Sequence, residues 1–76
     1  MSEFGVILFH TTSAALKAEK ALAGAGIAVK AIPVPREFSS DCGISVRFPG
    51  SRAAEVEHLL SANRVETAGI HELPSQ

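Results

Sequence analysis

The chain has 76 residues, of which 46% are hydrophobic and 20% charged, which predicts a single domain over residues 1–76 built around one core. Seven Lys and Arg nearly balance eight Asp and Glu to give a formal net charge of −1, so we expect no nucleic-acid partner, because a phosphate backbone requires a basic excess. The longest apolar run near the N-terminus covers only residues 6–9 and the start lacks a basic signal-peptide region, so we expect a cytoplasmic protein with no membrane partner.

The first half of the chain predicts a strand followed by a helix. Residues 4–9 are β-branched and aromatic without polar alternation, a pattern typical of a strand that is buried on both faces or central in a sheet. Alanine and leucine then recur at spacings of three and four over residues 13–25, which predicts a helix that Thr11 or Thr12 caps and that glycines terminate. The predicted apolar face of this helix consists of Ala14, Ala18, Ala21, Leu22 and Ala25.

Two further strands follow. Residues 27–32 are rich in isoleucine and valine and predict a second strand that Pro33 ends, because proline cannot donate a hydrogen bond to the sheet. Residues 43–48 alternate cleanly and predict a third strand, with Ser45 and Arg47 on its polar face. The opposite, apolar face of this strand consists of Ile44, Val46 and Phe48.

A second helix and a last strand complete the pattern. The helix is predicted to begin at a cap on Ser51 and to continue to Asn63, and residues 68–73 predict the last strand. This order predicts an α+β fold, a ferredoxin-like βαββαβ sandwich in which a four-stranded antiparallel sheet carries two helices on one face. In that topology the end of the first strand at His10, the start of the first helix and the start of the third strand at Gly43 lie at one edge of the sheet.

The ten-residue segment 33–42 is longer than a hairpin requires, which predicts a functional role for it. It contains the one cysteine of the chain, Cys42, which can form neither an internal disulfide nor a multi-thiolate zinc site. We expect no metal and no cofactor, since the three histidines share no ligand spacing. Arg36 in the same segment, together with His10 and the helix start at the same edge, favours a thiolate at Cys42, and the adjacent Gly43 leaves it accessible. The alternative interpretation is an irregular surface loop whose cysteine has no function.

Four blocks of the sequence form a recognisable set. They are Phe-His-Thr-Thr over residues 9–12, Pro-Val-Pro-Arg over 33–36, Ser-Ser-Asp-Cys-Gly over 39–43 and Gly-Ile-His-Glu-Leu over 69–73. These blocks resemble a small bacterial family of selenium or sulfur carrier-like proteins, and the resemblance extends over nearly the whole chain. It implies that Cys42 is the carrier residue and that Arg36 and Gly43 are motif positions. Ser39 and Ser40, in the same block as Cys42, are further candidate binding residues.

The resemblance favours a sulfur or selenium carrier that is used stoichiometrically and is not an enzyme. Cys42 would hold the atom as a persulfide or selenosulfide, received from a donor such as a cysteine desulfurase and passed to an acceptor protein, with Arg36 and the Gly43 backbone binding the anion. A lone thiol suits this task, because a second thiol would attack the persulfide and release its cargo. A non-catalytic ferredoxin-like interaction or ligand-sensing module and a thiol redox sensor are the alternatives.

The roles of His10, Leu16 and His71 are less definite. His10 is either a proton donor or acceptor beside Cys42 or a structural hydrogen-bonding group. Leu16 lies off the predicted apolar face and is either an isolated exposed side chain or part of a partner surface. His71 is predicted to alternate outward from an edge strand, and exposed edge strands permit a homodimer.

Overall fold

The structure, a computed structural model, describes residues 3–38 and 43–73, and the predicted order of helices and strands is confirmed in them. In chain order the elements are β1 (Phe4–Leu8), α1 (Thr12–Gly24), β2 (Lys30–Pro33), β3 (Ile44–Pro49), a 3₁₀ turn (Gly50–Arg52), α2 (Ala53–Ala62) and β4 (Gly69–Glu72). None of the helices formed by these residues is long and apolar enough to cross a membrane.

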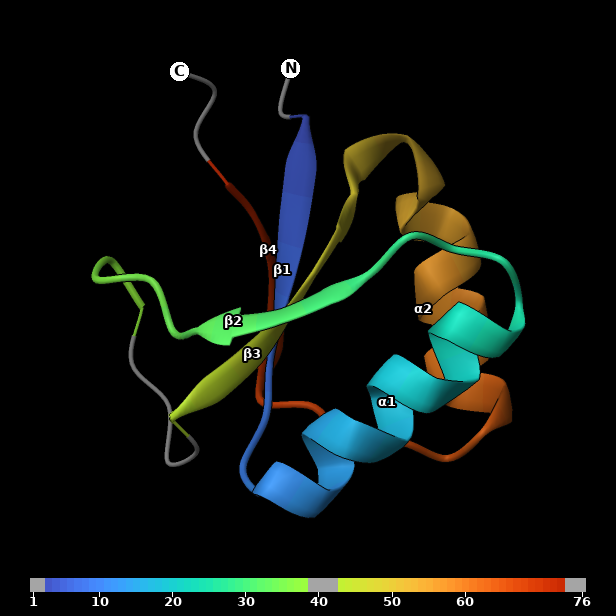
Figure 1. Cartoon of the computed structure of the whole chain (residues 1–76), viewed down its shortest axis with the longest axis horizontal. Helices are drawn as coiled ribbons and strands as arrows, with labels where there is room; N and C mark the ends of the chain where they lie inside the picture. The colour runs from blue at the N-terminus through green and yellow to red at the C-terminus, as the bar shows by residue number, and fades with distance from the viewer. Residues whose placement is uncertain (1–2, 39–42, 74–76) are drawn as a thin grey trace.

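The strands form one sheet in the order β2-β3-β1-β4, in which every neighbouring pair is antiparallel. β1 and β3 are central, as the connectivity predicts. Both helices cover one face of this sheet, whereas residues 34–38, which follow β2, lie on its opposite side (Figure 1). The α+β, ferredoxin-like prediction is therefore confirmed.

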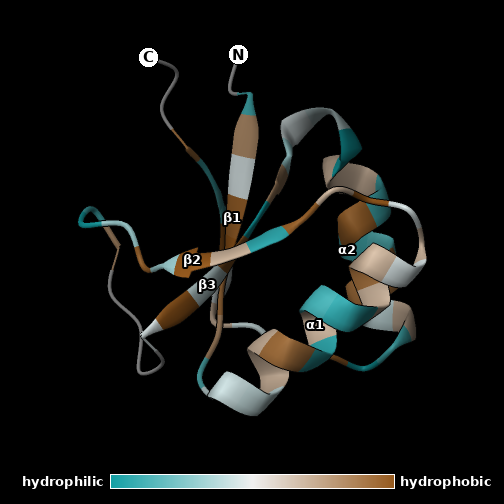
Figure 2. Cartoon of the chain, viewed as in Figure 1, coloured by the Kyte–Doolittle hydropathy of each residue, from teal (hydrophilic) through white to brown (hydrophobic). Residues whose placement is uncertain are grey.

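The hydrophobic core lies between the helices and the sheet, and hydrophobic segments accordingly occur in the central strands and in both helices (Figure 2). Gly5 of β1 leaves room for the Phe48 ring of β3, because a Cβ at Gly5 would lie closer than 3.0 Å to three ring atoms. The buried core residues are Ile7, Phe9, Ala15, Ala18, Leu22, Ile27, Val46, Phe48, Val56 and Leu60.

The start of α1 agrees with the prediction, whereas its buried face differs in part. Thr11 is the N-cap, and its side-chain oxygen accepts a hydrogen bond of 3.1 Å from the Ala14 N–H. The helix buries Ala15, which the predicted face omitted, and exposes Ala25, which that face included. Ala25 lies beyond the last helical residue, where Gly26 adopts a φ of +82° and turns the chain away from the helix axis.

β2 is shorter than predicted and begins at Lys30. The Ile27 N–H donates to the Leu22 carbonyl at 3.1 Å, so Ile27 completes the end of α1 and does not pair in the sheet. Its side chain is nevertheless buried in the core. The apolar pattern of residues 27–29 therefore comes from a partly buried segment that follows the helix. Periodicity alone does not distinguish such a segment from a buried strand.

The predicted cap at Ser51 is wrong. Ser51 lies inside the 3₁₀ turn, and α2 begins at Ala53 with Arg52 in the cap position and no side-chain capping bond. The Gly50 N–H donates to the Glu3 carbonyl at 2.9 Å, which ties this turn to the residue before β1. The second helix therefore begins after a turn that also contacts a distant part of the chain.

Candidate functional site

The structure brings two predicted site residues to the same end of the sheet. In the β1–β3 pair Leu8 is opposite Ser45, and the same register continued for two residues places His10 level with Gly43. Both His10 and Gly43 are exposed. The Gly43 carbonyl accepts a hydrogen bond of 3.4 Å from the Val34 N–H, which closes the β2–β3 loop at its base. The prediction that the end of the first strand and the start of the third lie together at one end of the sheet is confirmed.

This end of the sheet has a favourable backbone dipole. Within residues 3–38 and 43–73, no atom apart from those of the chain neighbours lies within 4 Å of the position that a Cβ on Gly43 would occupy. α1 begins two residues after His10 and directs the positive end of its dipole to this region. Cys42, which precedes Gly43 in the chain, lies outside the described residues, as do Ser39 and Ser40. Their predicted roles remain predictions.

Arg36 lies at the tip of the turn that follows β2. The Phe38 N–H donates to the Pro35 carbonyl at 3.0 Å, and this turn leaves both Arg36 and Glu37 exposed. Within residues 3–38 and 43–73 the Arg36 side chain forms no hydrogen bond or ion pair. The described contacts therefore do not join Arg36 to the end of the sheet where β1 finishes, and its role in anion binding stays a prediction.

The second feature is the face of the sheet that the helices leave uncovered, called here the open face. Residues directly opposite each other in antiparallel strands share a face, so the register defines this face. It consists of Phe4, Val6 and Leu8 of β1, Lys30 and Ile32 of β2, Ser45, Arg47 and Pro49 of β3, and Gly69 and His71 of β4. No Asp or Glu belongs to this set of strand positions.

The β2–β3 loop reaches across the open face. Phe38 stacks on His71 of β4, with ring centroids 4.5 Å apart and ring planes inclined by 19°. Since β2 and β4 are opposite edges of the sheet, a loop that leaves β2 and contacts β4 spans its width. Val6, which is directly opposite His71 in the β1–β4 pair, is fully buried, and Leu8 is 3% exposed. Neither belongs to the core under the helices.

The sequence interpretation missed this contact. Its available signals were Phe38, the one aromatic residue of segment 33–42, and the alternation that directs His71 away from the helices. The prediction that His71 is exposed is confirmed, but its ring also stacks on Phe38. The loop is therefore a partial cover of the open face.

Two polar side chains of β3 have specific contacts on the open face. The Arg47 guanidinium carbon lies 4.4 Å from the centroid of the Phe4 ring, which is a cation–π contact. Ser45 is fully buried, and its hydroxyl donates to the carbonyls of Ile32 at 3.2 Å and Pro33 at 3.4 Å. The alternation correctly placed both side chains on one face, but Ser45 is buried there and its hydroxyl bonds to β2.

Titratable side chains of the described residues do not form a metal-binding cluster. No three His, Asp or Glu side chains in residues 3–38 and 43–73 gather closely enough to hold a metal ion. Arg52 donates two hydrogen bonds of 2.6 and 2.8 Å to Glu55 and holds the pKa of that carboxyl below its usual value. This pair belongs to the start of α2, on the helix side of the sheet.

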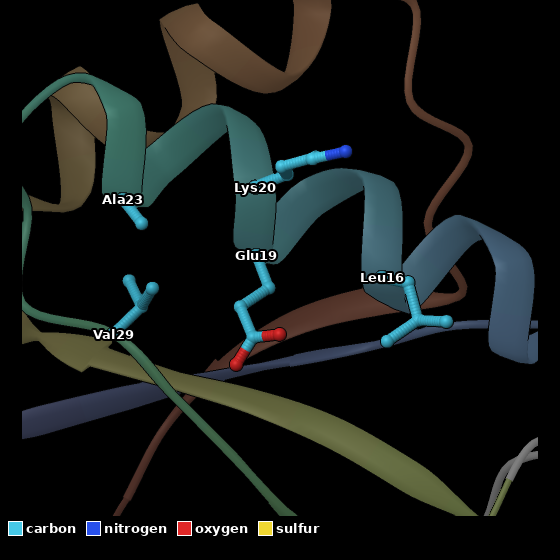
Figure 3. A pocket seen from close by; sticks show the side chains of 5 residues that line it. All are labelled: Leu16, Glu19, Lys20, Ala23 and Val29. Atoms are coloured by element: carbon cyan, nitrogen blue, oxygen red, sulfur yellow. The ribbon is translucent and has the colours of Figure 1, made fainter.

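A groove of about 490 Å³ lies between α1 and the segment before β2, and no predicted site residue lines it. Val29 points toward α1 from the segment before β2, while Glu19 and Leu16 project from the same side of the helix (Figure 3). Lys20 points away from Val29 (Figure 3). Leu16 is 55% exposed, as its place off the apolar face predicts, and the described contacts do not assign it a partner.

Comparison with known protein families identifies the chain. The family model described as "Putative Se/S carrier protein-like" matches residues 4–72, which extend from β1 to β4. The chain belongs to this family. The matched region includes His10, Arg36, Cys42 and Gly43, so the whole predicted site falls inside it. No curated protein and no solved structure matches the chain. The name of the carrier-like family implies a non-catalytic role.

Proposed function

We propose that this chain is a stoichiometric carrier that holds sulfur or selenium on Cys42 and passes it to a partner protein. The family match over residues 4–72 carries the proposal. The presence of one cysteine in the sequence supports it, because a persulfide with no second thiol in the same chain cannot be lost through an internal disulfide.

The loading step is a thiol–persulfide exchange. The thiolate of Cys42 attacks the outer sulfur of a donor persulfide; a new S–S bond forms while the S–S bond of the donor breaks, and the donor cysteine leaves as a thiolate. The exchange involves no net oxidation, so it requires no separate oxidant. Selenium is loaded in the same way from a donor that holds selenium on its cysteine. A cysteine desulfurase is a donor of the required class, and the acceptor protein receives the atom by a second exchange.

Features around Gly43 support an anion next to it in the chain. Gly43 is exposed and has no side chain, so Gly43 itself does not shield its backbone from a partner. The N-terminus of α1 lies at the same end and favours negative charge. In this proposal His10 exchanges protons at this end of the sheet, and Arg36 contributes positive charge from the same loop as Cys42.

Intact-protein mass spectrometry after incubation with a cysteine desulfurase and cysteine tests the proposal. The wild-type chain should gain the mass of one sulfur atom, which a reducing agent removes and prior alkylation prevents, and Cys42→Ala should gain nothing. With selenocysteine as the source, the gain should be one selenium atom. In a second stage, labelled sulfur should move from the loaded chain to an acceptor thiol protein. A chain that accepts neither atom, or never releases one, is not a carrier.

The same preparation separates the alternatives. A redox sensor would be oxidised by peroxide to a sulfenic acid but would take no sulfur from the persulfide donor. A ligand-binding module would bind its ligand equally well after Cys42→Ser. His10→Gln and Arg36→Gln, both at exposed positions, should slow loading while leaving the circular dichroism spectrum unchanged. Loading rates equal to wild type in both variants would remove these two residues from the site.

A further inference from the structure

The open face carries positive charge that no described residue balances. Lys30 of β2 and Arg47 of β3 are directly opposite each other, and like charges in this position destabilise an antiparallel pair. Neither side chain forms an ion pair within residues 3–38 and 43–73. The repulsive pair is present in a chain whose overall formal charge is −1, so the positive charge is concentrated locally.

The two cations are also available to a partner. Arg47 is partly exposed, and its contact with the Phe4 ring orients the guanidinium instead of leaving it mobile. Phe4 is itself 37% exposed, one of the large hydrophobic side chains of the described residues that face water. Lys30 is exposed on an edge strand. We call Lys30, Arg47 and Phe4 together the basic patch.

We propose that the basic patch docks an acidic segment of a partner protein. Carboxylates placed over Lys30 and Arg47 pair with both cations and relieve their mutual repulsion, and the Phe4 ring adds apolar contact area. Arginine and aromatic side chains are enriched in the buried centre of protein interfaces. A nucleic acid is a poorer match, because the chain lacks the basic excess that a phosphate backbone requires.

The carrier role suggests which partner this is. Residues 34–38 lie on the same side of the sheet as the basic patch, and they belong to the loop that continues to Cys42 (Figure 1). Arg36 and Glu37 in this loop carry opposite charges, so together they add no net negative charge that would repel an acidic partner. A protein that docks on the basic patch is therefore on the same side of the sheet as residues 34–38. Only this assignment, that the acidic partner loads or unloads Cys42, rests on the proposed function.

NMR titration of the full chain with a capped hexaglutamate peptide tests the docking surface directly. The amide signals of Val6, Lys30 and Arg47 should shift, whereas those of α1 should not. Binding should weaken several-fold between low ionic strength and about 0.15 M salt, because exposed charges are screened. The Cys42→Ala variant should bind the peptide like wild type, so this titration does not depend on the carrier chemistry.

Lys30→Glu and Lys17→Glu are a matched pair of variants, because both replace an exposed lysine and change the net charge equally. Lys30→Glu should weaken hexaglutamate binding at least about tenfold and raise the melting temperature, since it converts the repulsive pair with Arg47 into an attractive one. Lys17→Glu on α1 should keep the wild-type affinity. A gain in stability together with a loss of binding is a result that a purely structural role for Lys30 does not produce.

Several outcomes would overturn the proposal. Shifts spread equally over α1, or wild-type binding by Lys30→Glu, would show that the peptide recognises general positive charge. Inorganic phosphate or a single-stranded oligonucleotide that shifts the same amides at lower concentration than hexaglutamate would assign the patch to a different occupant. If the chain binds hexaglutamate but accepts no sulfur, the carrier function is wrong and the docking surface stands. If the chain accepts sulfur but does not bind hexaglutamate, the docking surface is wrong and the carrier function stands.

Discussion

Truncation of Phe38 tests whether its contact with His71 fixes the β2–β3 loop to the sheet. The rings are stacked with centroids 4.5 Å apart, and such a pair contributes about 0.5–1.5 kcal/mol beyond the area it buries. Phe38 is partly buried, so its removal also exposes roughly 50 Å² of apolar surface, worth about 1.3 kcal/mol. We therefore expect Phe38→Ala to lower the free energy of unfolding by about 2 kcal/mol in total.

Urea and thermal unfolding measure this loss. In a domain of this size 1 kcal/mol shifts the melting temperature by roughly 4–8 °C, so Phe38→Ala should melt about 8–16 °C below wild type. The double variant with His71→Ala should show a coupling energy of about 0.5–1.5 kcal/mol. Leu16→Ala is the matched control, because Leu16 is an exposed apolar residue on α1, on the other side of the sheet, and should add to His71→Ala without coupling.

Additivity would refute this reasoning. If the effects of Phe38→Ala and His71→Ala sum to within about 0.3 kcal/mol of the double variant, the ring contact does not hold the loop. The burial of Val6 would then require a different cover on the open face. A coupling of the same size between Leu16 and His71 would show that the cycle reports a general loss of structure.

Three further changes have definite expected outcomes. Gly5→Ala should cost about 1–3 kcal/mol in urea unfolding, because its Cβ would overlap the Phe48 ring; wild-type stability would show that the ring moves freely. Thr11→Ala should lower the free energy of unfolding by about 1 kcal/mol through the loss of the helix cap, whereas Thr11→Ser should keep most of the stability of the wild type. The hydrogen bond from Arg52 lowers the pKa of Glu55 below the usual 4.5, so the pair stabilises the fold above that pH and its contribution is lost as the pH falls further. Unfolding of Glu55→Gln from pH 7 to 3 should lack this part of the acid dependence; an identical profile would contradict the assignment.

Much of the architecture was predictable because it depends on local patterns and connectivity. The alternation over residues 44–48 identified the central strand β3, and the order of elements placed His10 and Gly43 at the same end of the sheet. Helix spacing located α1, and the preference of threonine for the cap position limited the cap to Thr11 or Thr12, of which the structure has Thr11. These inferences need no knowledge of contacts between distant residues.

The remaining features depend on such contacts and could not be predicted. Phe38 and His71 lie far apart in the sequence and belong to no common periodic pattern, so nothing local indicates that their rings meet. Alternation places Ser45 on the polar face, but does not indicate that it is buried there with its hydroxyl bonded to the end of β2. Ser51 has the side chain of a cap, yet it lies inside a 3₁₀ turn whose first residue, Gly50, donates a hydrogen bond to the distant Glu3 carbonyl.

The two faces of the sheet therefore have different physical roles, and this difference bears on how a carrier would meet its partners. The helix side is an apolar core, in which substitutions act on stability. On the open side, the burial of Val6 accompanies a loop contact, and Lys30 opposes Arg47 at a cost to the sheet. A partner bound to those cations would approach from the side on which residues 34–38 lie, whereas a partner on the helices would have the whole sheet between itself and that loop segment. Substitutions that change exchange with partners without unfolding the domain are thus expected on the open face and in its loop.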